Sequence, residues 1–507
     1  MIRKLCVGIA LLCLGACSPE EDASILPQYL DRMSPDMPSL NGSLYYSLTS
    51  GGSSPKALAD ATVAGSIYVW FEPNAPVVEV RFRIDDRQGD EQVERLVPYS
   101  LNGDEGVGQL NPYDTDQLSP GSHTLTVQIQ ATEGGDFQTE TISFTVDSNE
   151  PLPYDSPIVI TEGGTYQGRW ESTEAGTPAV LINTSDPVVI ENSEIRSKGE
   201  LIYLTSVQGG QLTVRNVTGY GSNPNREGAF PGRFVRANNY KSVTVEHCYF
   251  ENTSGILLHN SVSGASAKVL YNRARNIEGR YSDGNGGWQE GTKWNVQFLQ
   301  LDKGKELVDT EVAWNQIVNE PYQSRVEDVI NLYSTSGTST DPIKIHDNYI
   351  QGAFPADPAT DSYNGGGIML GDNGGSYQRA YDNQVVSTSN YGIAIAGGEY
   401  NQFYNNRVVS SGYLADGTYI ASQNVGIYIW NQSPEAPFRE AEAYNNVVGW
   451  VREGGRNDGW IGNGGADAAR WENNESIAGE ITQQTEQAEW DRWIQKLSDA
   501  GVIVGPQ

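Results

Sequence analysis

The chain has 507 residues with 38% hydrophobic and 10% aromatic content, enough for two or three domains with buried cores, which excludes a disordered polypeptide. Its 64 acidic residues outnumber its 33 basic ones and give a formal net charge of −31. This excess of negative charge argues against a nucleic-acid-binding protein, because phosphates need a basic surface. An anionic ligand would need a local cluster of basic residues.

The N-terminus has the pattern of a targeting segment. Arg3 and Lys4 precede an apolar run that ends in the sequence LGAC, whose last residue is Cys17. The run is too short to span a membrane, so residues 1–16 are predicted to be a signal peptide. LGAC resembles the lipobox of bacterial lipoproteins, which implies a lipid on Cys17, a tether over residues 17–41 and a protein anchored at the outer membrane or cell surface. An ordinary signal peptide with a coincidental cysteine is the alternative.

Residues 42–148 contain short alternating runs such as SIYVWFEP and HTLTVQIQA, separated by Gly, Pro, Asn and Asp. This pattern is typical of an all-β sandwich. The stretch YDTDQLSPGSHTLTVQI resembles bacterial immunoglobulin-like modules, which implies a spacer or a binding accessory. Residues 149–157, NEPLPYDSP, are predicted to be a linker.

Residues 158–476 carry an internal repeat, in which a β-branched or aromatic run recurs with an asparagine near its end, as in VAWNQIVN and FYNNRVVS. Asparagine tolerates the left-handed region, and its amide can bond to the same residue one coil away. The pattern resembles the asparagine ladder of right-handed parallel β-helices, so the predicted fold class is all-β, a parallel β-helix after a small sandwich. The aligned residues are Asn192, Asn216, Cys248, Asn272, Asn315, Asn348, Asn383, Asn406, Asn446 and Asn474.

A second repeated strand, seen in FLQLDK, VINLYS and IMLGDN, alternates apolar residues with others. The alternation places Ile330 and Leu332 inside and their neighbours outside. Longer loops precede these strands, and loops on one edge of a repeat structure usually wall its binding face. Residues 477–507 are predicted to form a helix that caps the last coil, because Trp490, Trp493, Ile494 and Leu497 share one face.

Polar side chains that can take part in catalysis are concentrated at the outward positions of the second strand set. Asn238, His259, Asp302 and Tyr333 fall on successive rungs, which are about 4.8 Å apart. Exposed strand residues that pair across rungs are the alternative interpretation. The repeat pattern resembles β-helical polysaccharide lyases and glycoside hydrolases, which implies a glycan substrate.

The leading prediction is a polysaccharide lyase that cleaves a uronate-containing, and so anionic, glycan by β-elimination. Arg236 and Lys303 could neutralise the uronate, and His259, Tyr333 or Lys303 could act as base or acid. The residues assigned to catalysis are His259, Tyr333, Lys303, Arg236 and Asp302. The residues assigned to substrate binding are Tyr203, Asn238, Gln300, Asn331, Arg325, Asp372, Tyr428 and Trp430.

Two other functions remain open from the sequence. The first is an inverting glycoside hydrolase that uses Asp302 and Asp372, two rungs and so roughly 9–10 Å apart. The second is a glycan-binding lipoprotein without turnover. The resemblance to lyases also implies calcium as a possible cofactor, with Glu327 and Asp328 as ligands. The pattern leaves the polysaccharide and the oligomeric state open.

Overall fold

The computed structural model describes residues 42–48, 55–85, 91–95, 97–103, 110–132, 134–147, 154–361, 365–433, 435, 437–462 and 468–507. The protein is all-β, with 51% of its residues in strands and one α-helix in the part described. No helix of that part is long and apolar enough to cross a membrane. The predicted signal peptide, the lipidation site Cys17, the tether and most of the linker lie outside the described residues.

The N-terminal strands form two five-stranded sheets that enclose a core of their own, with Phe71, Phe82 and Val127 at its centre. The first sheet contains β1 (Gly42–Ser47), β2 (Lys56–Ala57), β4 (Ser66–Pro73), β7 (Tyr99–Ser100) and β8 (Tyr113–Asp114). The second contains β3 (Thr62–Val63), β5 (Glu79–Ile84), β6 (Gln92–Glu94), β9 (Gly121–Gln130) and β10 (Phe137–Val146). The short alternating runs of the sequence therefore pair within two layers, which are antiparallel except where β3 pairs with β10 in parallel.

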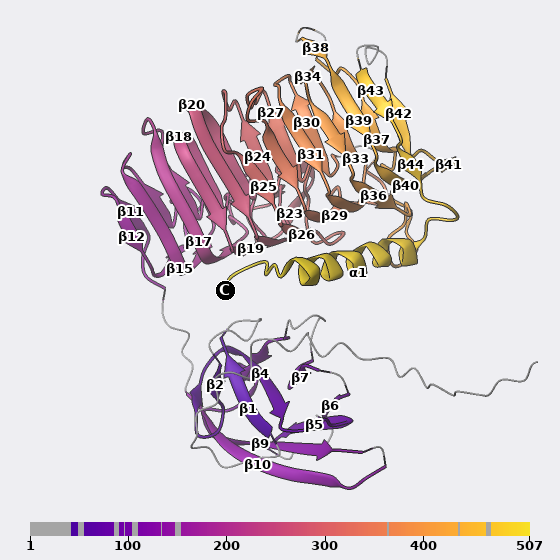
Figure 1. The fold of residues 1–507 in the computed structure, drawn as a ribbon. Helices are drawn as coiled ribbons and strands as arrows, with labels where there is room; N and C mark the ends of the chain where they lie inside the picture. Colours follow the sequence, from indigo (N-terminus) through magenta and orange to yellow (C-terminus); the bar gives the residue numbers. More distant parts are fainter. Residues whose placement is uncertain are drawn as a thin grey trace, which may run out of the picture.

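From Ile158 onward, thirty strands join one large sheet, in which each coil of the chain pairs in parallel with the next (Figure 1). The first coils contain β11 (Ile158–Ile160), β12 (Gly164–Tyr166), β13 (Arg169–Ser172), β15 (Pro187–Ser197) and β17 (Gly210–Gly221). One column of strands contains β14 (Val180–Ile182), β16 (Ile202–Leu204), β18 (Val235–Glu246), β20 (Ile256–Leu270), β24 (Leu299–Asp302), β27 (Ile330–Tyr333), β30 (Ile368–Asp372), β33 (Tyr391–Ile395), β37 (Val425–Ile429) and β42 (Gly459–Ile461).

Two further columns complete each coil. The second contains β25 (Glu311–Ala313), β28 (Ile343–His346), β31 (Gln378–Tyr381), β35 (Gln402–Tyr404), β39 (Ala441–Tyr444) and β43 (Ala468–Glu472). The third contains β19 (Tyr249–Glu251), β21 (Arg273–Arg275), β26 (Gln316–Val318), β29 (Tyr349–Ala353), β32 (Gln384–Thr388), β36 (Arg407–Ser410), β40 (Val447–Arg452) and β44 (Glu475–Ser476). The remaining strands are β22 (Arg280–Ser282), β23 (Trp288–Lys293), β34 (Gly398–Glu399), β38 (Phe438–Arg439) and β41 (Gly455–Arg456).

Buried asparagines link the coils from residue 272 onward. The Asn348 amide nitrogen donates to the Asn383 Oδ1 at 2.9 Å, and the Asn315 amide nitrogen donates to the Asn348 Oδ1 at 2.8 Å. The backbone N–H of Cys248 donates to the Asn272 Oδ1, so Cys248 stands at the ladder position that the sequence alignment gives it. The ladder members after Asn272 are Asn315, Asn348, Asn383, Asn406, Asn446 and Asn474.

The predicted alignment of Asn192 and Asn216 with this ladder is wrong by one residue. Strand pairing aligns Ser193 with Val217 instead, and Asn192 and Asn216 have left-handed backbones with φ of 47° and 52°. The left-handed position belongs to the residue that precedes each ladder member, here Asp347 before Asn348. The turn and the ladder bond are therefore made by two neighbouring residues, not by one asparagine.

The predicted inward positions of the first column are buried in the core. Five of these residues are fully buried, with 0% exposure: Leu299, Leu301, Ile330, Leu332 and Ile368. The alternation of the sequence thus identifies the core positions of these strands correctly, but some residues between them, such as Asn331 and Met369, are buried as well.

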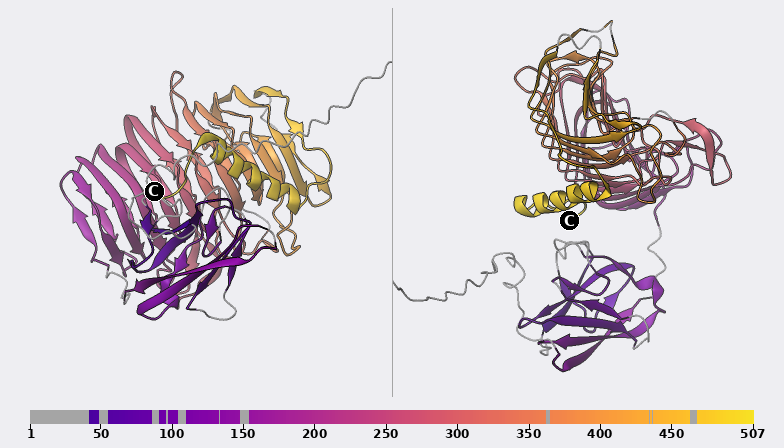
Figure 2. Two further views of the ribbon diagram at one scale, coloured as in Figure 1. Left: turned by 60° about the horizontal axis from the view of Figure 1, so that its bottom comes forward. Right: turned by 90° about the vertical axis from the view of Figure 1, so that its right-hand side faces the viewer.

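The C-terminal helix α1 (Gln483–Ala500) lies along the side of the coils (Figures 1 and 2), whereas the sequence predicted a cap on the last coil. Its buried Trp493 and Leu497 pack with Tyr349 and Val386 of β29 and β32. The Arg407 guanidinium forms two hydrogen bonds with the buried Glu489 carboxylate, at 2.6 and 2.7 Å. The apolar face of the helix is therefore buried against the third strand column.

The ladder predicts a large loss of stability on substitution of Asn348 by alanine. The change leaves the buried N–H groups of Asn315 without their acceptor, at about 1–3 kcal/mol for each group. We expect Asn348→Ala to lower the free energy of unfolding by about 3 kcal/mol or more, measured by urea denaturation. Asn285→Ala, which removes an exposed asparagine, is the control and should change it by less than about 0.5 kcal/mol. Equal losses of unfolding free energy in the two variants would contradict a stabilising role of the ladder hydrogen bonds.

Candidate functional site

The predicted polar column exists as a row of paired residues. Strand register aligns Asn238 with His259, His259 with Asp302, and Asp302 with Tyr333. The register shifts between β27 and β30, so Tyr333 pairs with Asp372. The shift brings both aspartates into the same row, one rung on either side of Tyr333. Tyr333 is half-buried, so it lies on the outer face of the sheet and not in the core.

His259 and Asp302 form one hydrogen-bonded pair. The His259 Nδ1 lies 2.6 Å from the Asp302 Oδ2, and the Asn260 amide nitrogen lies 2.9 Å from the His259 Nε2. In this arrangement the imidazole donates from Nδ1 and accepts at Nε2, which fixes its ring against the carboxylate. The pair holds one oxygen of Asp302 in place.

A second cluster joins three carboxyl groups at the entry to β27. The Asn331 amide nitrogen donates to the Asp328 Oδ2 and to the Asp372 Oδ2, each at 2.9 Å. Asp328 is buried, and its Oδ1 accepts from the Tyr391 hydroxyl and from the Gly366 backbone N–H. Asp372 is thus held by a side chain that is itself anchored on a buried acid.

Glu327 completes this cluster with a different environment. Its Oε2 accepts from the Gln297 amide at 3.2 Å, and its side chain is only partly covered. Burial, followed by the charge of the neighbouring Asp328, raises the pKa of Glu327 to about 8. Glu327 therefore carries a proton at neutral pH.

The two aspartates of this cluster are shifted in the same direction by burial. Desolvation raises the pKa of Asp372, and the Asn331 hydrogen bond opposes the shift. Desolvation also raises the pKa of Asp328, against hydrogen bonds from Tyr391 and Asn331. Carboxyl groups in unlike environments beside one another are a common feature of acid–base sites.

Several buried polar atoms of the row and of this cluster lack a partner in the described structure. They are the Asn238 Oδ1 and the Asp302 Oδ1 of the row, and the Asn331 Oδ1 and the Gln297 Oε1 of the cluster. Buried polar atoms are normally hydrogen-bonded, so unsatisfied ones indicate a place where a ligand or solvent binds. The sequence predicts three of these residues on the outward face, whereas Gln297 precedes β24 and was not predicted.

The predicted calcium ligands do not fit a calcium ion. Calcium needs six to eight oxygen ligands, but both oxygens of Asp328 already accept hydrogen bonds from N–H and O–H donors. In the described ranges, no three His, Cys, Asp or Glu residues are grouped to hold a metal ion. Asp328 is therefore not available as a calcium ligand.

Most of the basic residues predicted near the site are already engaged. The Arg236 Nη1 lies 3.2 Å from the Glu200 Oε1, with its guanidinium over the Tyr203 ring. Arg325, predicted to bind substrate, is 2% exposed and donates to the Trp294 carbonyl oxygen, so it does not lie on the open face. Arg233 is likewise buried and donates to the Ser254 carbonyl oxygen. Lys303, at the end of β24, is exposed beside Asp302.

The other predicted binding residues divide between open and covered positions. Tyr203 and Gln300 are half-buried, and Trp430 is 37% exposed. Tyr428 is buried, because Tyr391 packs edge-on against its ring at 5.3 Å and Met369 and Ala394 join the same apolar cluster. Asn331 and Asn238 are also buried, so they affect a ligand mainly through the side chains that they contact.

Two residues of the site were missed by the sequence interpretation. Tyr391 and Gln297 lie in loops or strand ends far along the chain from Asp328 and Glu327, and only their position before a repeated strand could have suggested them.

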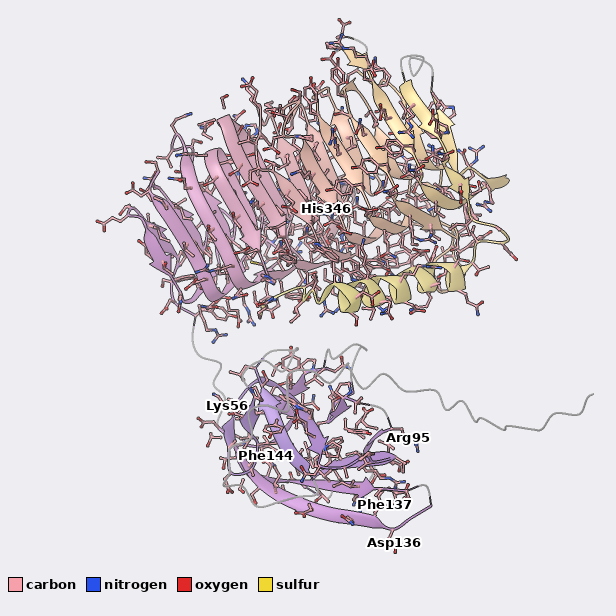
Figure 3. All side chains as sticks on the ribbon, in the orientation of Figure 1. Lys56, Arg95, Asp136, Phe137, Phe144 and His346 are labelled. Atoms are coloured by element: carbon pink, nitrogen blue, oxygen red, sulfur yellow. The ribbon has the colours of Figure 1, made fainter. Side chains whose placement is uncertain are left out.

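The remaining histidines have other partners. His346, labelled in Figure 3, bonds to Glu311 and Asp347 and stacks on Tyr381. Burial raises the pKa of the Cys248 thiol to about 12, which suits a core residue.

The raised pKa of Glu327 predicts a pH-dependent stability difference. In the unfolded chain this carboxyl ionises near pH 4.5, whereas in the folded protein it keeps its proton up to about pH 8, so stability falls as the pH rises between these values. Glu327→Gln should remove this loss. We expect the variant to gain, relative to the wild type, on the order of 3 kcal/mol between pH 5 and pH 8.5 in urea denaturation. The exposed Glu174→Gln serves as control, and a pH-independent difference for Glu327→Gln would contradict the shift.

Comparison with known proteins does not assign the chain to a family. No protein-family model, no curated protein and no solved structure matches it. The function is therefore inferred from the side chains of this site.

Proposed function

We propose that the polar face of the coils hydrolyses a glycosidic bond of a polysaccharide. The coils then form a right-handed parallel β-helix, and the N-terminal sheets form an immunoglobulin-like module. The observation that carries this proposal is the Glu327 carboxyl group, whose pKa is raised to about 8 by burial, near the Asp372 carboxylate, which stands in one row with Asp302. Glycoside hydrolysis uses two carboxyl groups, one protonated and one ionised.

In the proposed reaction, Glu327 is the general acid. Its proton goes to the glycosidic oxygen as the bond to the anomeric carbon breaks, and the leaving sugar departs as an alcohol. Asp372, held by Asn331, takes a proton from the attacking water. Asp302, held by His259, stabilises the positive charge that develops on the sugar ring. His259 and Asn331 act as positioning residues.

Hydrolysis fits the charges of the site better than β-elimination does. A lyase must neutralise the uronate carboxylate to acidify the neighbouring C–H bond. Arg236 is paired with Glu200, and Arg325 and Arg233 are buried against carbonyl oxygens. Lys303 is the exposed cation that a lyase would use, and its proximity to Tyr333 in the row makes β-elimination the second candidate.

We also propose that the enzyme is anchored at the cell envelope. The LGAC signal supports a lipid on Cys17 that anchors the protein at the cell envelope, outside the cell. Polymers too large to enter a cell are degraded by such anchored enzymes. The acidic net charge of −31 supports the absence of nucleic-acid partners.

The proposed reaction predicts which products form. We expect new reducing ends without the ultraviolet absorbance of an unsaturated uronate, when the protein is incubated with a panel of neutral and uronate polysaccharides. Glu327→Gln and Asp372→Asn should each lower kcat by about 10²-fold or more, and Lys303→Ala should retain most of it. An absorbing product together with loss of activity in Lys303→Ala would replace hydrolysis by β-elimination.

The role of Glu327 as an acid also predicts the pH profile. Because the acid must keep its proton, kcat/KM should fall as the pH rises above about 8. The alkaline limb should be absent from the residual activity of Glu327→Gln. A wild-type profile that rises through pH 8 would show that Glu327 acts as a base instead.

A further inference from the structure

Trp294 is an exposed aromatic ring with a built support. It follows the hairpin of β22 and β23 and is 48% exposed. Its ring is stacked on Phe230, with centroids 5.5 Å apart and planes 6° apart, and Phe230 contacts Tyr281 at 6.0 Å. Phe230 in turn packs against the main core. An exposed aromatic ring that is held on such a support offers a preformed flat face on which a ligand can stack.

The segment that carries this ring lies beside the segment that carries the proposed acid. The Arg325 Nη1 donates to the Trp294 carbonyl oxygen at 2.5 Å, two residues before Glu327. The backbone N–H of Glu327 donates to the Val296 carbonyl oxygen at 2.9 Å, two residues after Trp294. The two hydrogen bonds therefore hold the backbones of Trp294 and Glu327 close together.

The charges around the ring select a neutral ligand. Arg280, whose guanidinium lies 5.2 Å over the Trp288 ring, is bound to the buried Glu278 carboxylate through Nε at 2.9 and 3.0 Å. Arg325 is buried, and the Lys293 Nζ lies 3.9 Å from the Asp361 carboxylate. A uronate carboxylate at this ring would find the neighbouring cations already paired or buried, whereas the apolar C–H face of a neutral pyranose would meet the indole.

From this placement we propose that Trp294, backed by Phe230, is a stacking subsite for a neutral pyranose ring on the leaving-group side of Glu327. The inference rests on the proposed function for the direction of the chain, since the acid protonates the oxygen of the leaving sugar. Burial of one indole face by a sugar ring supplies affinity without an ion pair. The subsite narrows the substrate class from anionic to neutral glycans.

Binding by the full chain, with Glu327→Gln to prevent turnover, tests the subsite. Calorimetry with cellohexaose, mannohexaose and xylohexaose, and with hexagalacturonate as the anionic probe, gives the affinities. We expect at least one neutral hexasaccharide to bind, Trp294→Ala to weaken that binding about tenfold, and Trp294→Phe to retain most of it. Tyr413→Ala, which removes an exposed aromatic side chain outside this strand column, is the matched control and should leave the affinity unchanged.

The outcomes separate this inference from the proposed function. Binding that is unchanged in Trp294→Ala, or confined to hexagalacturonate, or absent for every neutral probe, overturns the subsite, whatever the wild type cleaves. Trp294-dependent binding of a neutral hexasaccharide by a wild type that releases no reducing ends supports the subsite and overturns hydrolysis. Thermal unfolding of Trp294→Ala must match that of Trp294→Phe, because an equal loss of fold would otherwise mimic a loss of binding.

Discussion

Strand register between successive coils is the constraint on which the site depends. Side chains alternate along a strand, so a slip by one residue would turn Asp302 and Tyr333 into the core and expose Leu301 and Leu332. The buried amides of the ladder oppose such a slip, because each must meet its counterpart on the next coil. The register also shifts between β27 and β30, as it does between other strands such as β18 and β20. The pairing of Asp372 with Tyr333 depends on this shift.

Desolvation acts on neighbouring carboxyl groups that have different hydrogen-bond donors. Asp328 is buried and accepts three hydrogen bonds, from Tyr391, Gly366 and Asn331, yet desolvation still raises its pKa. Glu327 has one side-chain donor, Gln297, and lies beside Asp328, so its neutral form is favoured. Each hydrogen-bond donor lowers the free energy of the charged form, so the donors oppose the effect of burial at each carboxyl group.

The sequence predicts what depends on local alternation and misses what depends on distant loops. The row from Asn238 to Tyr333 follows from a period of two, which neighbouring residues reveal. The misalignment of Asn192 arises because two adjacent positions both accept asparagine, one for a left-handed backbone and one for the ladder. The burial of Arg325 and Tyr428, and the contact of Tyr391 with Asp328, depend on segments that pair only after the coils are stacked.

Charge shows the same limit. The sequence assigns Arg236, Lys303 and Arg325 to a site for an anionic glycan, but a cation attracts an anion only where its charge is not already matched. Glu200 pairs with Arg236 from 36 residues away, and the Arg325 guanidinium is turned to backbone and amide oxygens, whereas Lys303 is exposed. The number of basic residues in a stretch of sequence therefore does not give the charge that the folded site presents to a ligand.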